Sequence, residues 1–364
     1  MGVRFAVIGP PYSGKTTMLS AISGVGGEHL HEVQPGSGMH LATLKYEHDP
    51  RLQALHKMHN SKKTTPAMFE IMDFPGFDLT DQTGREHVQR VVAEVRQCDL
   101  LIIVLRAFED SSVPAYRDRI DPQADLDELT DEFVFADMEQ ITRRIQKLEV
   151  SSKKPTPTAN KELEKKEMEM LKRCLAALEQ GKPVDQVPNG AEEMKMLKGF
   201  TLLTQHPLLV IINVSEDQLT RKFDLKLGGM IKGSMVCAGK FEQELWQLSE
   251  EDRTTFMAEA GVTEPVQNRL IKMGLDGLNM ILFYTSGEDD ARAWLLEKGA
   301  KAVEAAGKIH SDISRGFIRA ETVHYDDLMA IGSEKQARAA GKLRLEGKDY
   351  IVKDGDVIEF RFNV

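Results

Sequence analysis

Residues 3–19 read VRFAVIGPPYSGKTTML. An apolar run of strand length, residues 3–8, leads into a loop with the pattern G-x-x-x-x-G-K-[ST], and a helix-compatible segment begins at Thr17. A strand, a glycine-rich loop and a helix in this order are typical of a phosphate-binding P-loop, in which backbone N–H groups surround phosphate oxygens. The alternative is an ordinary glycine-rich turn between a strand and a helix. The pattern predicts a nucleotide-binding α/β domain.

The P-loop pattern gives roles to individual side chains. Lys15 is expected to reach the β- and γ-phosphates of a nucleotide, which makes it a candidate catalytic residue. The Thr16 hydroxyl is expected to ligate Mg²⁺. The residues of this segment that are expected to contact the nucleotide are Pro11, Tyr12, Ser13, Gly14, Lys15, Thr16 and Thr17.

Length and composition set the broad class of protein. A chain of 364 residues exceeds the size at which a single hydrophobic core usually stops growing, which predicts two or three domains. The three cysteines are far apart, so we expect no disulfide framework or metal cluster, and a cytoplasmic location fits. No apolar run approaches the ~20 residues of a membrane span. The net charge of −10 argues against a uniformly basic nucleic-acid binder and leaves room for a local basic face.

A second nucleotide-binding motif follows a second expected strand. Residues 67–72 end in Asp73-Phe74-Pro75-Gly76, a D-x-x-G motif. In P-loop proteins this carboxylate holds Mg²⁺, and the N–H of the glycine, here Gly76, meets the γ-phosphate. The segment 24–45 between the motifs is expected to sense the γ-phosphate. Ser37 in this segment is a candidate metal ligand, with a solvated loop serine as the alternative.

The residue after the D-x-x-G motif bears on catalysis. Ras-type GTPases carry a glutamine there, which orients the attacking water. This chain has Phe77, whose side chain has no hydrogen-bonding group. Phe77 therefore occupies a catalytic position without the catalytic group. We expect either another water-positioning group or very slow turnover.

Two further apolar runs, 100–105 and 207–212, predict buried strands of a parallel sheet. Between them, apolar residues at heptad spacing predict a helical hairpin over 126–198, with a breaker-rich loop at 151–157. The lysines of this hairpin are candidate RNA contacts, and a solvated coiled-coil surface is the alternative. The expected apolar seam comprises Val134, Met138, Ile141, Ile145, Leu148, Leu163, Leu171, Cys174 and Leu178.

The strand at 207–212 ends in Asn213-Val214-Ser215-Glu216. Guanine-specific proteins typically end this strand with N-K-x-D, and the aspartate accepts from the guanine N1–H and exocyclic amine. Here Val214 replaces the lysine and the longer Glu216 replaces the aspartate, which is expected to relax the preference for guanine and to favour adenine. A further strand at 234–238 is expected to supply the last base-contacting loop, through Cys237 and Ala238.

These features together resemble the YchF/Obg-like ATPase family, in the Obg branch of P-loop NTPases. The most specific resemblance lies at the end of the chain, in GFIRAE (316–321), GKDYIV (347–352) and FRFNV (360–364). This part looks like a TGS domain, a ubiquitin-like β-grasp module, and Ile358, Phe360 and Phe362 alternate with polar residues as in a half-buried strand. The segment Asp49-Pro50-Arg51-Leu52 and the helical insertion also match, so the similarity spans essentially the whole chain.

The resemblance implies a Mg²⁺-dependent hydrolase that binds ATP and GTP, usually prefers ATP, and associates with ribosomes in translation and stress responses. It implies an OBG-type nucleotide domain at 1–125 and 199–280, a coiled-coil insertion at 126–198 and a TGS domain at 281–364. We expect no membrane association, and a monomer is favoured. A hydrophobic residue in place of the catalytic glutamine, as at Phe77, is also usual in the family.

The chain departs from the family pattern near the expected chemistry. Tyr12 stands where the family P-loop usually has an asparagine, which supports a monovalent cation in related proteins. Pro75 precedes the glycine of the D-x-x-G motif, where the family usually has alanine. Ala115 stands where many members have a histidine proposed to help hydrolysis. These departures leave potassium stimulation and turnover open.

Three functions therefore fit the sequence. The first is a slow ATPase switch that acts on the ribosome, and the second is a nucleotide-dependent binding module with little or no hydrolysis. The third is a GTP-preferring GTPase. A P-loop small-molecule kinase fits poorly, because such a kinase needs a substrate pocket and an arginine-bearing lid, whereas this chain supplies D-x-x-G, N-x-x-E and a TGS-like end.

Overall fold

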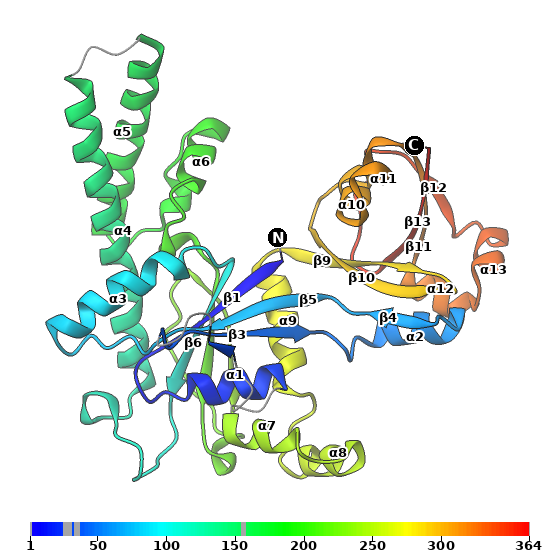
Figure 1. Ribbon diagram of the computed structural model, residues 1–364, viewed down its shortest axis with the longest axis horizontal. Coiled ribbons are helices and arrows are strands. Elements are labelled where there is room, and N and C mark those ends of the chain that lie inside the picture. The colour runs from blue at the N-terminus through cyan, green and yellow to red at the C-terminus, as the bar shows by residue number, and fades with distance from the viewer. Residues whose placement is uncertain (1, 25–30, 33–36, 154–157, 364) are drawn as a thin grey trace. The chain divides into compact units, whose positions relative to one another are not determined.

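The computed structural model describes residues 2–24, 31–32, 37–153 and 158–363. Apart from the first two residues, the chain divides into two compact units. Unit 1 comprises Val3–Ala42 and Glu70–Val266, and unit 2 comprises Thr43–Phe69 and Gln267–Val364. A seven-stranded sheet lies mainly in unit 1 and a six-stranded sheet in unit 2 (Figure 1).

The seven-stranded sheet has the strand order β2-β3-β5-β1-β6-β7-β8. Its strands are β1 (Val3–Ile8), β2 (His31–Glu32), β3 (His40–Lys45), β5 (Met68–Asp73), β6 (Leu100–Arg106), β7 (Leu208–Asn213) and β8 (Ile231–Cys237). Strands β1, β6, β7 and β8 pair in parallel, and every residue of β6 is buried. A continuous apolar strand of this kind is expected where a parallel sheet is covered on both faces. The loops that follow β1 and β7 therefore leave the same edge of the sheet, which is where ligands bind in such folds.

The helices outside the insertion include α1 (Lys15–Ser23), α3 (Gln82–Val95), α7 (Gly239–Leu245), α8 (Glu250–Glu259) and α9 (Val266–Gly277). Helix α3 is amphipathic, and its apolar stripe packs in the same core as β6 and β7. This stripe comprises Val88, Val91, Val92 and Val95. Short 3₁₀ helices occur at Tyr116–Asp118, Val184–Gln186, Leu203–Gln205 and Glu216–Gln218.

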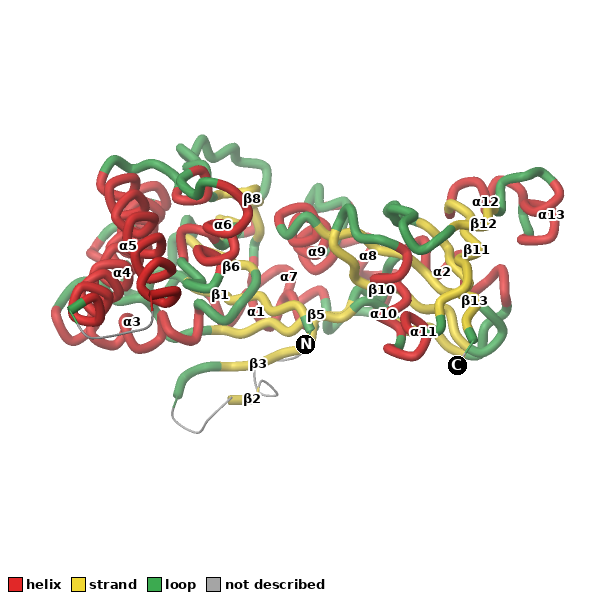
Figure 2. The backbone as a smooth tube through the Cα atoms, turned by 90° about the horizontal axis from the view of Figure 1, so that it is seen from above, coloured by secondary structure: helices red, strands yellow, loops and turns green. Residues whose placement is uncertain are grey.

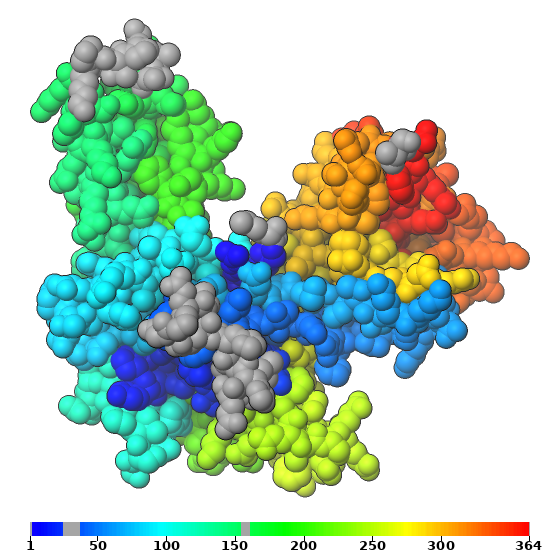
Figure 3. Space-filling model, viewed as in Figure 1, coloured from blue at the N-terminus to red at the C-terminus, as the bar shows by residue number. Residues whose placement is uncertain are grey.

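The insertion between β6 and β7 forms a helical hairpin of α4 (Pro122–Ser152) and α5 (Thr158–Glu179), followed by α6 (Gly190–Lys198). Helix α4 begins after Asp121, whose carboxylate accepts from the Ala124 N–H, and Pro122 is its first residue. The two long helices lie side by side in both ribbon and tube views (Figure 1 and Figure 2). In the space-filling view they project from unit 1 as an arm (Figure 3).

The core of the hairpin agrees with most of the predicted seam. Val134 and Met138 are half-buried and pack against a buried set. That set includes Ile141, Ile145, Leu148, Leu171, Cys174 and Leu178. The prediction is wrong for Leu163, whose side chain is 48% exposed in the first turns of α5. The predicted breaker-rich loop falls partly on residues 154–157, which lie outside the described residues, and α4 continues through Ser152.

The six-stranded sheet of unit 2 has the order β12-β11-β13-β9-β10-β4. Its strands are β4 (Lys63–Thr65), β9 (Met280–Ser286), β10 (Asp290–Glu297), β11 (Phe317–His324), β12 (Arg344–Glu346) and β13 (Asp356–Phe362). Its helices are α2 (Pro50–His59), α9 from Gln267 onward, α10 (Ala302–Ile309), α11 (Ser311–Arg315), α12 (Tyr325–Ile331) and α13 (Glu334–Ala339). The predicted C-terminal strand is confirmed as β13, in which Ile358 is buried, whereas Phe362 is 45% exposed.

Residues 43–69 pack in unit 2, which the sequence did not predict. Strand β4 pairs in parallel with β10. The Tyr284 hydroxyl donates to Asp49 Oδ2 at 2.6 Å, and Arg51 donates to Asp354 at 2.6 Å. Burial raises the pKa of the Tyr284 hydroxyl, so it remains a hydrogen-bond donor. These contacts tie the start of α2 to strand β9 and to the turn before β13.

Candidate nucleotide-binding site

The P-loop connects β1 to α1. At two of its positions neighbouring atoms lie so close to the backbone that only glycine fits. A Cβ atom at Gly9 would lie 2.4 Å from the Val104 carbonyl oxygen, and one at Gly14 would lie 2.3 Å from Asn213 Nδ2. Gly14 also has φ of 88° and is the N-cap of α1. Tyr12 adopts φ of 61°, and its side chain is 56% exposed. The loop is therefore pressed against β6 and β7, with Tyr12 facing solvent.

Lys15 and Ser13 place buried polar groups in the P-loop. Lys15 is 8% exposed, and its Nζ donates to the Pro10 carbonyl at 3.0 Å. Burial lowers the pKa of the Lys15 ammonium to about 8, although the nearby Asp73 carboxylate opposes the shift. The buried Ser13 Oγ has no hydrogen-bond partner among the described residues. A buried cation and an unpaired hydroxyl beside a helix N-terminus are suited to an anionic ligand.

Thr16 and Asp73 come from different segments and meet beside the P-loop. The Thr16 hydroxyl donates to Asp73 Oδ2 at 2.7 Å. Asp73 is 2% exposed, and its Oδ1 has no hydrogen-bond partner in the part of the chain that the structure describes. Burial raises the pKa of the Asp73 carboxyl, while the Thr16 hydrogen bond and the Lys15 charge oppose this. A hydroxyl and a carboxylate with an unused oxygen fit Mg²⁺, which prefers oxygen ligands.

The D-x-x-G motif packs onto the P-loop, and Gly38 packs onto the D-x-x-G motif. A Cβ atom at Gly76 would lie 2.9 Å from Pro11 Cα, and one at Gly38 would lie 3.4 Å from Pro75 Cγ. The Phe77 N–H donates to the Gly9 carbonyl at 2.9 Å. The D-x-x-G motif thus bridges the start of the P-loop and the segment that contains Gly38.

Ser37, the predicted metal ligand, makes a local contact. Its Oγ accepts from the Met39 N–H at 3.2 Å, which closes a short turn. His40, which the sequence analysis did not single out, lies nearer to the expected metal site, with Nδ1 3.7 Å from Asp73 Oδ2. Its place in the segment 24–45, which was expected to sense the γ-phosphate, was the available signal in the sequence.

Phe77 lies in the hydrophobic core. Its side chain is 1% exposed and packs edge-on against Phe133 of α4. The residue at the glutamine position therefore has its side chain buried among apolar groups of unit 1. In this conformation the Phe77 side chain contributes packing and no polar contact, and it is the backbone N–H of Phe77 that makes a hydrogen bond, to Gly9.

The segment around Ala115 contacts the backbone that follows Phe77. The Tyr116 hydroxyl accepts from the Leu79 N–H at 3.1 Å, and Arg117 donates to the Leu79 carbonyl at 3.0 Å. Arg117 adopts φ of 53°, a left-handed conformation that few side chains take. Ala115 itself is half-buried and offers only backbone groups. The loop after the D-x-x-G motif is thus held by two neighbours of Ala115 that sequence analysis missed.

Asn213 ties together the loops at the expected base-binding end. Its Nδ2 donates to the Ser13 carbonyl at 3.0 Å, and its Oδ1 accepts from the Gly239 N–H at 3.0 Å. Thr17 lies close by, because a Cβ atom at Gly239 would be 3.7 Å from its methyl group. The Asn213 amide thus holds the P-loop against the β8–α7 loop.

The other residues expected near the base differ in exposure. Val214, Cys237 and Ala238 are buried, and the Val214 N–H donates to the Cys237 carbonyl at 3.0 Å. Glu216 is exposed at the start of a 3₁₀ helix. Among these four residues, Glu216 alone presents a polar side chain to solvent.

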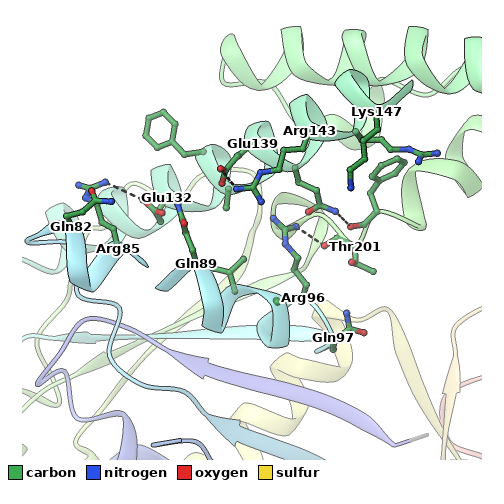
Figure 4. A pocket seen from close by; sticks show the side chains of 17 residues that line it. Gln82, Arg85, Gln89, Arg96, Gln97, Glu132, Glu139, Arg143, Lys147 and Thr201 are labelled. Atoms are coloured by element: carbon green, nitrogen blue, oxygen red, sulfur yellow. Dashed lines mark hydrogen bonds and ion pairs between the residues drawn. The ribbon is translucent and has the colours of Figure 1, made fainter. Parts of the chain in front are cut away.

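A groove of about 840 Å³ lies between α3 and α4, and no P-loop residue lines it (Figure 4). Its basic residues are largely paired: Arg143 with Glu139, and Arg85 with Glu132 at 3.7 Å. At one end Arg96 donates to the Thr201 carbonyl at 3.0 Å. Because acidic partners neutralise this charge, the groove has no clear preference for an anionic ligand.

Among the described residues, no helix combines the length and the apolar character that crossing a membrane requires. Those residues also contain no group of three or more histidine, cysteine, aspartate or glutamate side chains able to hold a metal ion. A metal ion beside Thr16 and Asp73 would therefore need further ligands from a nucleotide or from water.

Two family models match the chain. Residues 4–161 match a family described as 50S ribosome-binding GTPase. Residues 280–363 match the YchF-GTPase C-terminal family, described as a protein of unknown function. The two matches cover the P-loop, the D-x-x-G motif and most of unit 2.

Curated relatives are similar over the whole chain. The ribosome-binding ATPase YchF of Bacillus subtilis (strain 168) is 36% identical over 377 residues and is covered, like this chain, to 100%. Obg-like ATPase 1 of Oryza sativa subsp. japonica is 32% identical over 378 residues, covering 100% of this chain and 92% of the relative. The solved structure of the Schizosaccharomyces pombe YchF GTPase aligns with a TM-score of 0.80 at 23% identity, covering 99% and 98% of the two chains. This likeness confirms the predicted fold class.

Proposed function

The chain belongs to the YchF family, and we propose that it is a P-loop NTPase that binds ATP with Mg²⁺, hydrolyses it slowly and associates with ribosomes. One observation carries the proposal. The buried Lys15, the Thr16 hydroxyl and the Asp73 carboxylate converge at the N-terminus of α1, beside the unpaired Ser13 hydroxyl. Relatives named ribosome-binding ATPase support the ribosome as partner and the cytoplasm as location.

The residues of the site divide the work of binding. Residues 11–17 supply backbone N–H groups, and Lys15 supplies positive charge for the β- and γ-phosphates. Thr16 and Asp73 would hold Mg²⁺, with Ser37 as a further proposed ligand. When bound, Mg²⁺ would neutralise charge that develops on the phosphate oxygens. Gly76 would offer its N–H to the γ-phosphate.

The base would lie against the loops that Asn213 ties together. Val214, Cys237 and Ala238 would border it with backbone groups, while Glu216 would discriminate between bases. The Glu216 side chain is one methylene longer than the aspartate that pairs with guanine, so its carboxylate does not take the same position, and we propose ATP as the preferred nucleotide. A GTP preference is the alternative, which a direct comparison of the two nucleotides decides.

Slow hydrolysis follows from the position of Phe77. Its side chain is buried, and the next segment is held by Tyr116 and Arg117. Position 77 carries no polar side chain that could orient the attacking water. This favours a switch in which nucleotide binding, more than turnover, changes what the helical hairpin at 126–198 and the TGS module at 281–364 present to the ribosome.

Calorimetric titration with non-hydrolysable ATP and GTP analogues, with and without Mg²⁺, tests the proposal. We expect Mg²⁺-dependent binding of the ATP analogue, loss of binding in Lys15→Ala and unchanged binding in Lys147→Ala, a change of an exposed lysine on α4. Absence of Mg²⁺-dependent binding to either analogue in the wild-type protein would refute the proposal. Single-turnover hydrolysis with and without ribosomes then separates a slow ATPase from a pure binding module.

A further inference from the structure

Three donor groups of different chemistry lie together at the expected metal site. The Thr16 hydroxyl is 2.7 Å from Asp73 Oδ2, and His40 Nδ1 is 3.7 Å from the same oxygen. These residues come from α1, from β3 and from the end of β5. Tertiary packing, rather than a local motif, brings the imidazole to the carboxylate.

The His40 nitrogen has no hydrogen bond that explains its burial. His40 Nδ1 and Asp73 Oδ1 are both buried atoms without a hydrogen-bond partner among the described residues. The separation of 3.7 Å between Nδ1 and Oδ2 is too long for a hydrogen bond. Buried polar atoms are costly unless a partner satisfies them, so two such atoms in one place indicate a ligand that both can contact.

The distances suit a shared cation. Around an octahedral ion with bonds of about 2.1 Å, neighbouring ligand atoms lie about 3 Å apart. The separations of 2.7 Å and 3.7 Å from Asp73 Oδ2 lie on either side of this value. A small movement of the imidazole, whose side chain is 26% exposed, would bring Nδ1 to the spacing from Asp73 Oδ2 that two ligands of one ion have.

The donor set also bears on which ion is preferred. Mg²⁺ selects oxygen ligands and keeps several waters. An imidazole nitrogen adds a donor that favours divalent transition-metal ions. The affinity of these ions for such ligands rises along the Irving–Williams series, which begins at Mn²⁺. We propose that His40 ligates the nucleotide-bound ion together with Thr16 and Asp73, so that the site takes Mn²⁺ in preference to Mg²⁺. This inference rests on the proposed nucleotide binding and specifies its metal.

Pulsed electron paramagnetic resonance of the Mn²⁺ complex with a non-hydrolysable ATP analogue tests the assignment. We expect a nitrogen coupling on Mn²⁺ that changes when the protein carries ¹⁵N-labelled histidine and the nucleotide does not. Because the labelled wild-type protein gives this result, the test does not depend on a variant that folds. The coupling should be lost in His40→Gln and kept in His87→Gln, which changes an exposed histidine of α3.

Calorimetry with Mn²⁺ and Mg²⁺ gives a second measurement. We expect the ratio of the Mn²⁺ to the Mg²⁺ affinity to fall about tenfold in His40→Gln and to stay unchanged in His87→Gln. Binding of the Mn²⁺–nucleotide without histidine coupling would overturn the role of His40 and leave the proposed function intact. A wild-type protein that binds no metal–nucleotide complex would instead refute the proposed function itself.

Discussion

Phe77 lies edge-on against Phe133, with ring centroids 6.4 Å apart and ring planes at 89°. Phe77 begins the loop after the D-x-x-G motif, and Phe133 belongs to α4 of the helical hairpin. The position that holds a water-orienting glutamine in Ras-type GTPases therefore connects the nucleotide site to the hairpin. A change at the γ-phosphate that moved this loop would have to move or break a buried aromatic contact, which is worth about 0.5–1.5 kcal/mol beyond its burial.

The first prediction concerns the stability of this contact. Phe133→Ala should lower the free energy of unfolding by about 3–5 kcal/mol, because it leaves a cavity in the core that contains Phe77. Phe135→Ala is the matched control, since Phe135 lies on the same helix and is 62% exposed. Its cost should stay within about 0.5 kcal/mol. Equal losses in urea unfolding of the two variants would contradict the buried contact.

The second prediction concerns catalysis at the same position. Phe77→Gln should not raise the single-turnover rate of ATP hydrolysis, because a side chain at this position enters the core rather than the phosphate site. Burying an amide without a partner should instead lower the free energy of unfolding by about 2 kcal/mol. A faster rate in this variant, at wild-type stability, would show that position 77 reaches the nucleotide.

The third prediction concerns the buried ion pair between α3 and α4. Arg96 lies 2.6 Å from Asp137, which is fully buried and also accepts from the Leu203 N–H. Asp137→Ala should cost about 3–5 kcal/mol, because it leaves the arginine unpaired in the core. The exposed Glu139 pairs with Arg143 on the same helix, so Glu139→Ala should cost less than about 1 kcal/mol. The two losses in the free energy of unfolding can be compared by thermal and urea unfolding. A similar loss in both variants would contradict the importance of burial for the Arg96–Asp137 pair.

The fourth prediction is a pH dependence of nucleotide affinity. The pKa of Lys15 is lowered to about 8 by burial, and phosphate contact favours the charged ammonium. Below pH 8 the ammonium is already charged, so affinity should be flat. Above pH 8 binding must take up a proton, and affinity should fall by up to tenfold for each pH unit.

Calorimetry in buffers of different ionisation enthalpy measures this uptake directly. Proton uptake on binding should be small at pH 7 and approach one proton above pH 9. Lys15→Arg keeps its charge throughout and, where it binds, should show no such slope. Constant affinity of the wild-type protein from pH 7 to pH 9.5 would contradict a lowered pKa.

Much of the fold was predictable, because its signals are local. The P-loop pattern follows a strand and precedes a helix, and continuous apolar runs mark β6 and β7 as buried parallel strands. Heptad spacing predicted the hairpin, and it failed at Leu163 because spacing alone does not say where the helix pair stops burying its seam. The pairing of β4 with β10 joins segments far apart in sequence, and no local signal indicates it.

The candidate site shows the same limit. Thr16 and Asp73 were predicted to share a metal because a D-x-x-G motif at the end of a strand after a P-loop is the arrangement of P-loop NTPases, and the structure brings their side chains together. His40, Tyr116 and Arg117 were missed, because their contacts depend on how loops fold over that edge. Asn213 was expected at the base, and only the structure shows that both polar atoms of its amide contact backbone groups of neighbouring loops.

The last prediction concerns base preference. Glu216 is exposed at the start of a 3₁₀ helix, where a shorter carboxylate would restore the N-x-x-D spacing of guanine-specific proteins. Glu216→Asp should raise the affinity for GTP relative to ATP by about tenfold, or ~1.4 kcal/mol. Asp217→Glu is the control, because it lengthens the neighbouring exposed side chain by one methylene, and it should leave the ratio of GTP to ATP affinity unchanged. If Glu216→Asp also leaves the ratio unchanged in titrations with both analogues, the Glu216 carboxylate does not discriminate between the bases, and the backbone groups of the buried Val214, Cys237 and Ala238 would have to do so.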